Sequence, residues 1–336
     1  MYLFFKILPN RRISVLNITV IGCGRWGSFL AWYMRRLGNN VTIYGREGSA
    51  SLNELMRSRK NEYLTLQDDI AFSCDLKTSL ESADTVIISI GAQGLPALAE
   101  SIKNATPEAS DKRYVLCMKG IVENGGKRLS EVMTDTLGKD VKIAVWLGPG
   151  HVEDFTAEIP NCMIICSSDE NYAKELCSTF GSNLIRFYYS QDLIGCELGA
   201  ATKNVMGIAA GILDGMGYTS LKGSLMARGP REIARLAEAM GGNEKSIFGL
   251  CHIGDYEATL FSSHSHNRKY GEAFIKKEPY DKLAEGVYTV RSVLELGKKY
   301  GVELPVCQTV NDIIHGGFDA EQALTALFLR AQKSEF

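Results

Sequence analysis

The sequence lacks the features that mark several specialised classes of protein. It has no apolar run of about 18 residues, the length that a helix needs to cross a bilayer, so we expect no membrane span. Its formal net charge is only −2, which argues against nucleic acid as the main partner. Its nine cysteines are scattered and form no Cys-x-x-Cys pair of the kind that binds zinc. We therefore expect reduced thiols, no bound metal and a cytoplasmic location.

The composition is that of an ordinary globular protein. Hydrophobic residues make up 45% of the 336 positions and charged residues 23%, and no internal repeat or low-complexity linker is present. This length predicts two domains or one large domain. The first residues, MYLFFKILPNRR, place an apolar patch before two arginines, which is the reverse of an export signal. We expect an extra strand or a frayed tail there.

A glycine-rich turn joins an early strand to a helix. The β-branched run Ile18–Ile21 precedes Gly22, Gly24 and Gly27, and the amphipathic stretch that follows predicts a helix over Ser28–Leu37. In this context Gly-x-Gly-x-x-Gly predicts a dinucleotide site. Gly22 permits the tight turn, Gly24 lets the backbone approach a pyrophosphate, and Gly27 lets the helix pack on the strand. The alternative is a glycine turn without a ligand.

The end of the second strand bears on which dinucleotide binds. Val41–Tyr44 are predicted to form this strand, and the position that carries an acidic residue in many NAD sites holds Gly45 and Arg46. An arginine there suits the 2′-phosphate of NADP, so Arg46 slightly favours NADP over NAD. Two alternatives stay open: Arg46 is a solvated surface residue, or Glu47 binds the ribose of NAD.

Further apolar strands alternate with helices up to about residue 190. The segments ADTVIISIG, RYVLCMKG and KIAVWLGPG predict strands buried on both faces, and NCMIICSS and IRFYYSQD predict two more. Leu95–Lys103 and Arg128–Leu137 are predicted to form helices between them. This alternation predicts an α/β fold with a parallel, doubly wound, Rossmann-like sheet. Ligands of such sheets bind at the carboxyl ends of the strands, where Lys119 and Gly148 lie.

Helical patterns replace strand patterns after residue 190. Four helical segments begin near Leu193, Ser224, Pro279 and Leu304. Pro230 predicts an interruption of the second. We therefore expect a dinucleotide-binding domain over residues 1–192 and an all-α substrate domain over residues 193–336. We expect the two domains to pack on each other and to share a long helix.

Lys203 is the one charged residue in the segment GAATKNVMGIAAG, residues 199–211. On a helix it shares a face with Gly199, Gly207 and Ala210, so another backbone or a ligand can come close. Desolvation would lower the pKa of its amine and suit it to exchange a proton near neutral pH. The alternative is a lysine whose stem is buried and whose ammonium reaches water.

A short polar segment further along the chain is rich in hydrogen-bond donors. GDYEATLFSSHSHNRKYG, residues 254–271, contains several groups able to hold a phosphate, and Asn267 and Arg268 are the strongest candidates. A metal at His264 and His266 is conceivable, but two histidines without a fixed acidic partner are more typical of a solvated loop.

Seven motifs in a fixed order resemble the NAD(P)-dependent glycerol-3-phosphate dehydrogenases. They are GCGRWG, MKG at 118–120, GPGHVEDFTAEIP at 148–160, GAATKNVMGIAAG, RG…EIARL at 228–236, GDYEAT…SHSHNRKYG and AEGVYT at 284–289. The resemblance implies a dinucleotide-binding N-terminal domain, an all-helical C-terminal domain and a homodimer. It also implies reversible hydride transfer between NAD(P)H and dihydroxyacetone phosphate, giving sn-glycerol 3-phosphate for phospholipid synthesis.

The resemblance also implies roles for individual residues. Lys203 matches the proton-transferring lysine, Asp255 an aspartate that orients it, and Lys119 a second lysine that contacts cofactor and substrate. The other implied substrate contacts are Gly148, Gly150, Asn204, Thr259, Ser265, His266, Asn267 and Arg268. The implied cofactor contacts are Gly22, Gly24, Arg25, Trp26, Gly27, Arg46, Lys119, Val152, His266, Leu283 and Glu285. Structural alternatives remain for four of them: a helix cap for Asp255, a surface strand end for Lys119, the edge of a packed core for Trp26 and a bond to a neighbouring helix for Asn204.

Two departures from the family pattern put the substrate in question. His266 stands where the family has the arginine of Ser-Arg-Asn, and Gly150 stands where it has the serine of Gly-Pro-Ser. Losing a bidentate guanidinium at a phosphate costs a few kcal/mol unless Arg268, Arg228 or a protonated His266 compensates. Two rival functions therefore stay open. One is a related two-domain dehydrogenase for another small phosphorylated polyol or hydroxy acid, and the other is a non-catalytic NAD(P)-binding sensor.

Overall fold

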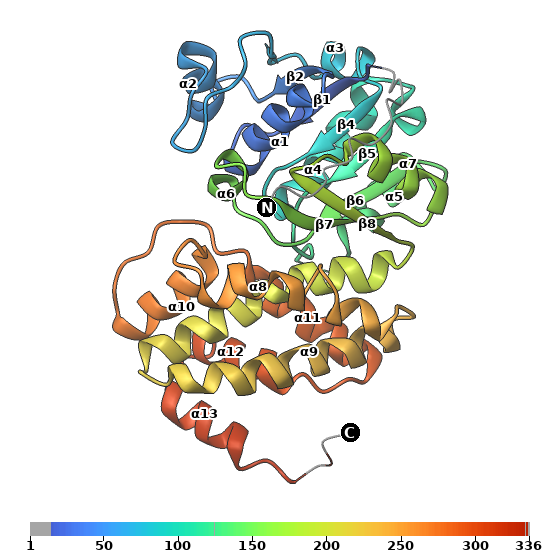
Figure 1. The fold of residues 1–336 in the computed structure, drawn as a ribbon. Coiled ribbons are helices and arrows are strands. Elements are labelled where there is room, and N and C mark those ends of the chain that lie inside the picture. Colours follow the sequence, from blue (N-terminus) through green and yellow to red (C-terminus); the bar gives the residue numbers. More distant parts are fainter. Residues whose placement is uncertain (1–14, 124, 333, 335–336) are drawn as a thin grey trace, which may run out of the picture.

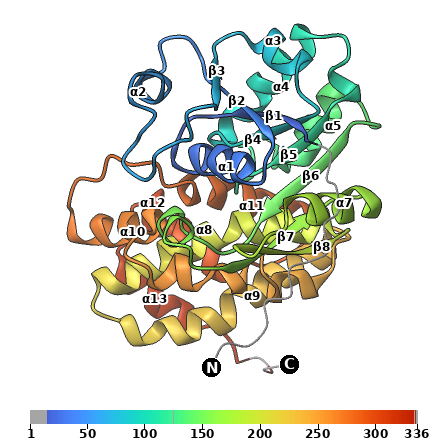
Figure 2. The same ribbon diagram turned by 45° about the horizontal axis from the view of Figure 1, so that its top comes forward.

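The chain folds into a sheet layered between helices, followed by a bundle of helices (Figure 1; Figure 2). The structure, a computed structural model, describes residues 15–123, 125–332 and 334. The strand or tail expected at the first residues lies outside this part of the chain. None of the described helices is long and apolar enough to cross a membrane.

Eight strands form one sheet in the order β3-β2-β1-β4-β5-β6-β7-β8. Their bounds are β1 Asn17–Ile21, β2 Asn40–Tyr44, β3 Ala71–Ser73, β4 Thr85–Ile88, β5 Arg113–Leu116, β6 Lys142–Leu147, β7 Asn161–Cys166 and β8 Ile185–Ser190. The doubly wound, Rossmann-like sheet is confirmed, with one correction. All neighbouring strands are parallel except β6 and β7, which are antiparallel. Their connection contains only the five-residue helix α6 (Val152–Thr156) and returns along the same edge instead of crossing the sheet.

Helices cover both faces of this sheet. On one face α1 (Arg25–Arg36), α2 (Ala50–Ser58) and α7 (Glu170–Phe180) pack around Phe29 and Trp146. On the other face α3 (Leu76–Glu81), α4 (Leu95–Ala105) and α5 (Leu129–Leu137) pack around Leu95 and Leu116. α1 begins three residues earlier than expected, because Gly24 is its N-cap and the glycine turn leads directly into the helix. The helix N-terminus therefore lies at the carboxyl edge of β1.

α8 (Leu193–Gly215) is the central helix of the C-terminal half. Every residue from Gly195 to Leu213 is buried, because α9, α10, α11 and α12 all pack against it. The bounds of the surrounding helices are α9 Lys222–Ala239, α10 His266–Lys276, α11 Gly286–Tyr300, α12 Pro305–Ile314 and α13 Ala320–Phe328. The C-terminal half is thus all-helical, as expected.

Two expectations about these helices are wrong. α9 continues through Gly229 and Pro230, although a proline inside a helix removes one backbone hydrogen bond. Both residues are buried, and Gly229 lies against Met206 of α8, so packing on the central helix offsets that loss. The polar stretch after Ser265 is also not a loop. It forms α10, and Ser265 Oγ caps it by accepting from the backbone N–H of Arg268 at 3.3 Å.

Candidate active site

Glycines on one face of α8 let the polar segment pack directly on the helix. A Cβ at Gly199 would lie 3.1 Å from His252 Cβ, and a Cβ at Gly207 would lie 3.0 Å from Thr259 Cγ2. The close approach expected at this face is therefore made by side chains of another segment of the same chain. Lys203 lies on α8 between these two glycines, so its side chain faces the segment that contains His252 and Thr259.

Two lysines share one carboxylate at the junction of the sheet and the helices. Asp255 Oδ2 lies 2.7 Å from Lys203 Nζ and 2.7 Å from Lys119 Nζ. Lys203 also donates to Thr259 Oγ1 at 2.8 Å, and Lys119 donates to the carbonyl of Gly148 at 3.0 Å. The side chain of Lys203 is 9% exposed, that of Asp255 2% and that of Lys119 25%. The alternative of a Lys203 ammonium in water is therefore wrong.

The surroundings of Lys203 set its protonation. Burial lowers the pKa of Lys203 to about 8, and the positive charge of Lys119 acts in the same direction, against the Asp255 carboxylate. An amine with this pKa is available in both protonation states near neutral pH, which is what a group that gives and takes a proton requires.

Two asparagines tie the strand end of Lys119 to the helices. Asn204 Nδ2 donates to the carbonyl of Lys119 at 3.1 Å, and Asn267 Nδ2 donates to Asn204 Oδ1 at 3.1 Å. Asn267 Oδ1 in turn accepts from the backbone N–H of Gly286 at 2.9 Å, at the start of α11. Both asparagines were expected to bind substrate, with a bond to a neighbouring helix left open for Asn204. In the structure Asn204 bonds to the sheet half, and Asn267 holds Asn204 within the helical half.

The glycine turn has the shape that a dinucleotide needs. A Cβ at Gly22, whose φ is +118°, would overlap the carbonyl oxygen of Ser89, and a Cβ at Gly27 would overlap the carbonyl oxygen of Gly22. Gly24, in contrast, has no atom within 4 Å of its Cβ position. The open space lies at the N-terminus of α1, where backbone N–H groups and the helix dipole favour a phosphate. These residues fit the pyrophosphate of NAD(P).

Glu285 offers an acceptor on the opposite side of the strand ends. Its Oε1 accepts from the backbone N–H of Ala92 at 3.2 Å, just after β4, whereas its Oε2 is buried without a partner in the described part of the chain. Burial raises the pKa of this carboxyl. A buried acceptor without a donor is unfavourable, so Glu285 fits a ligand that brings an N–H or O–H. Leu283 is exposed next to it, with its Cδ2 3.9 Å from the Cβ position of Gly91.

The other expected cofactor residues differ in their surroundings. Arg46 is exposed directly after β2, and Val152 is buried at the start of α6. Trp26 packs against Phe29 with ring centroids 4.8 Å apart and belongs to the edge of the core. Arg25 forms an ion pair with Glu153 of α6.

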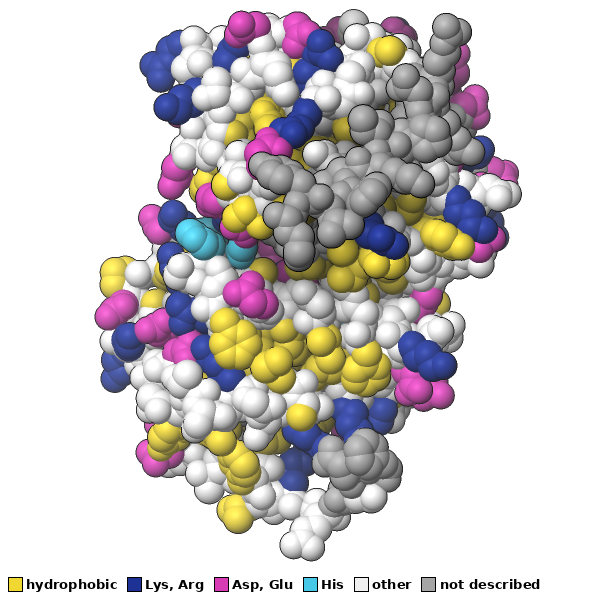
Figure 3. All heavy atoms as spheres, in the orientation of Figure 1, with side chains coloured by type: hydrophobic (Ala, Val, Ile, Leu, Met, Phe, Trp, Pro, Cys, Tyr) yellow, Lys and Arg dark blue, Asp and Glu magenta, His cyan; other side chains and the backbone are white. Residues whose placement is uncertain are grey.

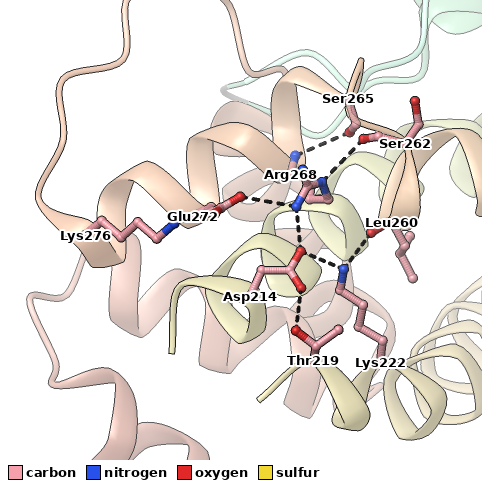
Figure 4. A network of polar contacts seen from close by, with 9 residues as sticks. All are labelled: Asp214, Thr219, Lys222, Leu260, Ser262, Ser265, Arg268, Glu272 and Lys276. Carbon is pink, nitrogen blue, oxygen red and sulfur yellow. Dashed lines mark hydrogen bonds and ion pairs between the residues drawn. The ribbon is translucent and has the colours of Figure 1, made fainter. Parts of the chain in front are cut away.

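Arg268 and Arg228, two of the candidates to compensate for the missing arginine, lie apart from the lysine cluster. Arg268 Nη1 lies 2.6 Å from Asp214 Oδ2, and the same carboxylate oxygen lies 2.6 Å from Lys222 Nζ (Figure 4). Asp214 is about 16 Å from Lys203 along the axis of α8. Arg228 lines a cavity of about 690 Å³ between α8, α9, α12 and α13, whose lining contains no residue of the cluster.

The surroundings of His266 disfavour its protonated form. Burial lowers its pKa, and Lys282, Arg25 and Lys269 lower it further. Its Nδ1 lies 2.7 Å from the hydroxyl of Tyr280. Protonation of His266 in place of the missing guanidinium is therefore disfavoured, whereas the three cations around it supply positive charge at the start of α10.

Histidines from the two halves meet nearby. The rings of His151 and His264 lie 5.5 Å apart, and Figure 3 shows histidine side chains gathered at the boundary between the halves. His151 follows Gly150, whose φ is +143° and whose Cβ would overlap the ring of Phe155. A serine does not fit at position 150 unless Phe155 moves. The glycine that replaces the family's serine is therefore explained by the packing of Phe155.

Sequence reasoning missed Glu197, a buried carboxylate on α8. Glu197 Oε2 lies 2.7 Å from Arg128 Nη1, and Glu197 also accepts from the backbone N–H and the hydroxyl of Ser130 at the start of α5. This group joins α8 to the sheet half. The signal was present, because Glu197 is a charged residue in an apolar helix, just as Lys203 is.

Comparisons with known proteins agree with this geometry. The model of the NAD-dependent glycerol-3-phosphate dehydrogenase N-terminus matches residues 17–173, and that of the C-terminus matches residues 192–325. The glycerol-3-phosphate dehydrogenase (NAD(P)+) of Prosthecochloris aestuarii is 34% identical over 332 residues, which cover 95% of this chain and 99% of the relative. The enzyme of that name from Clostridium botulinum strain Eklund 17B is 32% identical over 330 residues, with coverage of 95% and 99%.

A solved structure extends the agreement to three dimensions. The crystal structure of glycerol-3-phosphate dehydrogenase from Coxiella burnetii matches with a TM-score of 0.86 and 28% identity, covering 94% of this chain and 99% of that one. Fold and length both correspond. The chain belongs to the NAD(P)-dependent glycerol-3-phosphate dehydrogenase family.

Proposed function

We propose that the protein interconverts dihydroxyacetone phosphate and sn-glycerol 3-phosphate by reversible hydride transfer with NAD(P)H. The observation that carries this proposal is the buried cluster in which Lys203 and Lys119 share the carboxylate of Asp255. The cluster lies at the carboxyl ends of β5 and β6, the edge at which parallel sheets bind their ligands. A non-catalytic sensor has no need of a buried lysine whose pKa is close to 8.

Each residue of the cluster has a distinct task in the proposed reaction. Bound NAD(P)H supplies the hydride. Lys203, as an ammonium, gives a proton to the carbonyl oxygen of the ketone and retrieves it in the oxidation direction. Lys119 adds positive charge where the alkoxide develops, and Asp255 keeps both ammonium groups in place. Arg25, Lys269 and Lys282, which surround His266, supply the charge that attracts phosphate to this junction.

The direct test is an assay with purified protein, dihydroxyacetone phosphate and either NADH or NADPH, followed at the absorbance of the reduced nicotinamide. We expect oxidation of the nicotinamide that depends on the triose phosphate. Other phosphorylated polyols and hydroxy acids in the same panel should react much more slowly. Faster turnover of one of them would favour the related dehydrogenase, and nucleotide binding without any turnover would favour the sensor.

The pKa of Lys203 predicts opposite pH profiles for the two directions. Ketone reduction needs the ammonium, so kcat/KM should be at its plateau below pH 8 and fall about tenfold per unit above it. Alcohol oxidation needs the free amine, so kcat/KM should rise with pH and level off above about 8. Steady-state rates between pH 6 and 10 measure both limbs. A profile flat from pH 7 to 9 in both directions would exclude Lys203 as the proton-transfer group.

Arg46 is proposed to favour NADP through the 2′-phosphate. It follows β2 directly and is exposed, so it is free of packing constraints. Changing Arg46 to Gln should raise KM for NADPH by about tenfold to 10²-fold and leave KM for NADH nearly unchanged, because a charged hydrogen bond to phosphate contributes about 1.5–3 kcal/mol. Arg57→Gln, an exposed arginine in the last turn of α2, is the control. Equal effects on both cofactors would contradict the assignment.

Three further features are proposed on the same basis. The boundary between the domains is placed at residues 192/193, where β8 has ended and α8 begins. The protein is proposed to act as a homodimer in the cytoplasm. Exposed apolar side chains on the helical half, such as Phe248 and Phe318, give a surface on which a second copy can pack.

A further inference from the structure

We propose that His252 and Tyr256 are positioning residues that hold Asp255 against Lys203, and so set the proton affinity of the lysine. The proposal rests on the proposed function. His252 lies two residues before the motif GDYEAT, and Tyr256 lies within it, but neither residue was assigned a role from the sequence. Both flank Asp255 in the sequence, and both are completely buried, with 0% and 1% exposure.

His252 joins the turn that carries Asp255 to the helix that carries Lys203. Its Nδ1 lies 2.7 Å from the carbonyl oxygen of Gly199, one helical turn before Lys203 on α8. Its own carbonyl accepts from the backbone N–H of Asp255 at 3.0 Å. Together with the 2.7 Å contact between Asp255 and Lys203, these bonds close a ring from α8 through the turn and back to α8.

Tyr256 fixes the imidazole of His252 within this closed path of hydrogen bonds. Its hydroxyl lies 2.8 Å from His252 Nε2, and the two rings meet edge to face with centroids 4.9 Å apart. Because a carbonyl oxygen only accepts hydrogen bonds, His252 Nδ1 must carry the proton that goes to Gly199. His252 Nε2 must then accept from the Tyr256 hydroxyl. Only the neutral imidazole can make both bonds, and burial keeps it neutral by lowering the pKa of His252 to about 4.

Gly199 is the third part of this arrangement. A side chain there would push on His252 Cβ and Cys251 Sγ, each 3.1 Å from the Cβ position. The groups that face Lys203 are Asp255 and Thr259 from the segment held by His252 and Tyr256, and Lys119 from the end of β5. Loosening that segment removes the negative charge from Lys203 and leaves the positive charge of Lys119 in place.

The test compares Tyr256→Phe with the wild-type protein by steady-state kinetics between pH 6 and 10. The variant leaves His252 Nε2 without its donor. We expect the kinetic pKa assigned to Lys203 to fall by about one unit, because a carboxylate close to an amine raises its pKa. We also expect kcat to fall about tenfold to 10²-fold with KM for the nicotinamide nearly unchanged. His252→Asn keeps a donor for Gly199 but loses the acceptor, and should give the same shift.

Tyr114→Phe is the matched control. It deletes another buried tyrosine hydroxyl, which donates to the carbonyl of Ala109 at 2.8 Å, inside the sheet half. It should lower the melting temperature as much as Tyr256→Phe does, with an unchanged pH profile. If the profile of Tyr256→Phe also coincides with that of the wild type, the residues are merely structural and the proposal is wrong.

A readout without turnover separates this proposal from the proposed function. The Cε signal of Lys203 can be titrated by ¹³C NMR, with Lys203→Ala used to assign it. A downward shift in Tyr256→Phe supports the positioning role even if dihydroxyacetone phosphate is not the substrate. An unshifted signal overturns the role even if the assay succeeds.

Discussion

Replacing Lys203 by alanine is expected to lower turnover by about 10²–10⁴-fold while nucleotide affinity stays nearly intact. The reason is that Lys203 Nζ is the proposed proton donor and is buried in the cluster, whereas the glycine turn proposed to receive the pyrophosphate lies on the sheet half. Asp255 keeps Lys119 as a partner at 2.7 Å, so the variant does not leave an unpaired buried carboxylate. The measurements are kcat in both directions and the Kd of NADPH by titration calorimetry.

The control for this variant is a second buried lysine outside the cluster. Lys222 is 5% exposed and pairs with Asp214, so Lys222→Ala also removes a buried ammonium from an ion pair. We expect this control to lose stability and to retain turnover. A Lys203→Ala protein that keeps full turnover, or that loses nucleotide affinity as much as it loses turnover, would show that Lys203 has a structural role.

Replacing Gly211 by alanine is expected to destabilise the helical half by about 3 kcal/mol or more. A Cβ at Gly211 would overlap the carbonyl oxygen of Arg268 and lie 2.8 Å from the backbone nitrogen of Glu272. Both obstacles are backbone atoms of α10, so the whole helix must move, and overpacking of this kind is among the large single-residue effects. The shift would also displace Asn267, which holds Asn204. The measurement is the free energy of unfolding in urea.

Gly223→Ala is the matched control for this prediction. Gly223 lies in the first turn of α9 and has no atom within 4 Å of its Cβ position. The same substitution there should leave stability unchanged or raise it by up to about 1 kcal/mol, because alanine favours the helix. Equal stability changes in the two variants would mean that α10 is not in close contact with α8.

Periodicity and composition predicted the elements whose signals are local. The β-branched runs that end at Ile21 and Tyr44 predicted strands, and the glycines that follow the first run predicted the turn. The lysine amid small apolar residues at position 203 was singled out by its setting, but the pattern left open whether its ammonium is buried or reaches water. Each of these signals depends on residues within one element, so no knowledge of the neighbours was needed.

The features that the sequence did not predict have a common cause: each depends on contacts between different elements of the chain. The antiparallel pairing of β7 depends on the path of the connection through α6, and the continuity of α9 depends on Met206 of α8 packing against Gly229. The pairing of Arg268 with Asp214 could not be foreseen, because the two residues are 54 positions apart in the chain. His252 was missed because one of its partners is the backbone carbonyl of Gly199 on α8. That contact exists only once α8 packs beside the turn that carries His252 and Tyr256.

The sequence alone determined the alternation of strands and helices, the phosphate-binding turn and the identity of the charged residues at the site. Only the tertiary structure decided that Lys203 and Lys119, 84 positions apart, would share one carboxylate oxygen. The physical reason is that local patterns specify which face of an element is buried, whereas the protonation of a buried amine depends on charges that other elements bring within about 4 Å.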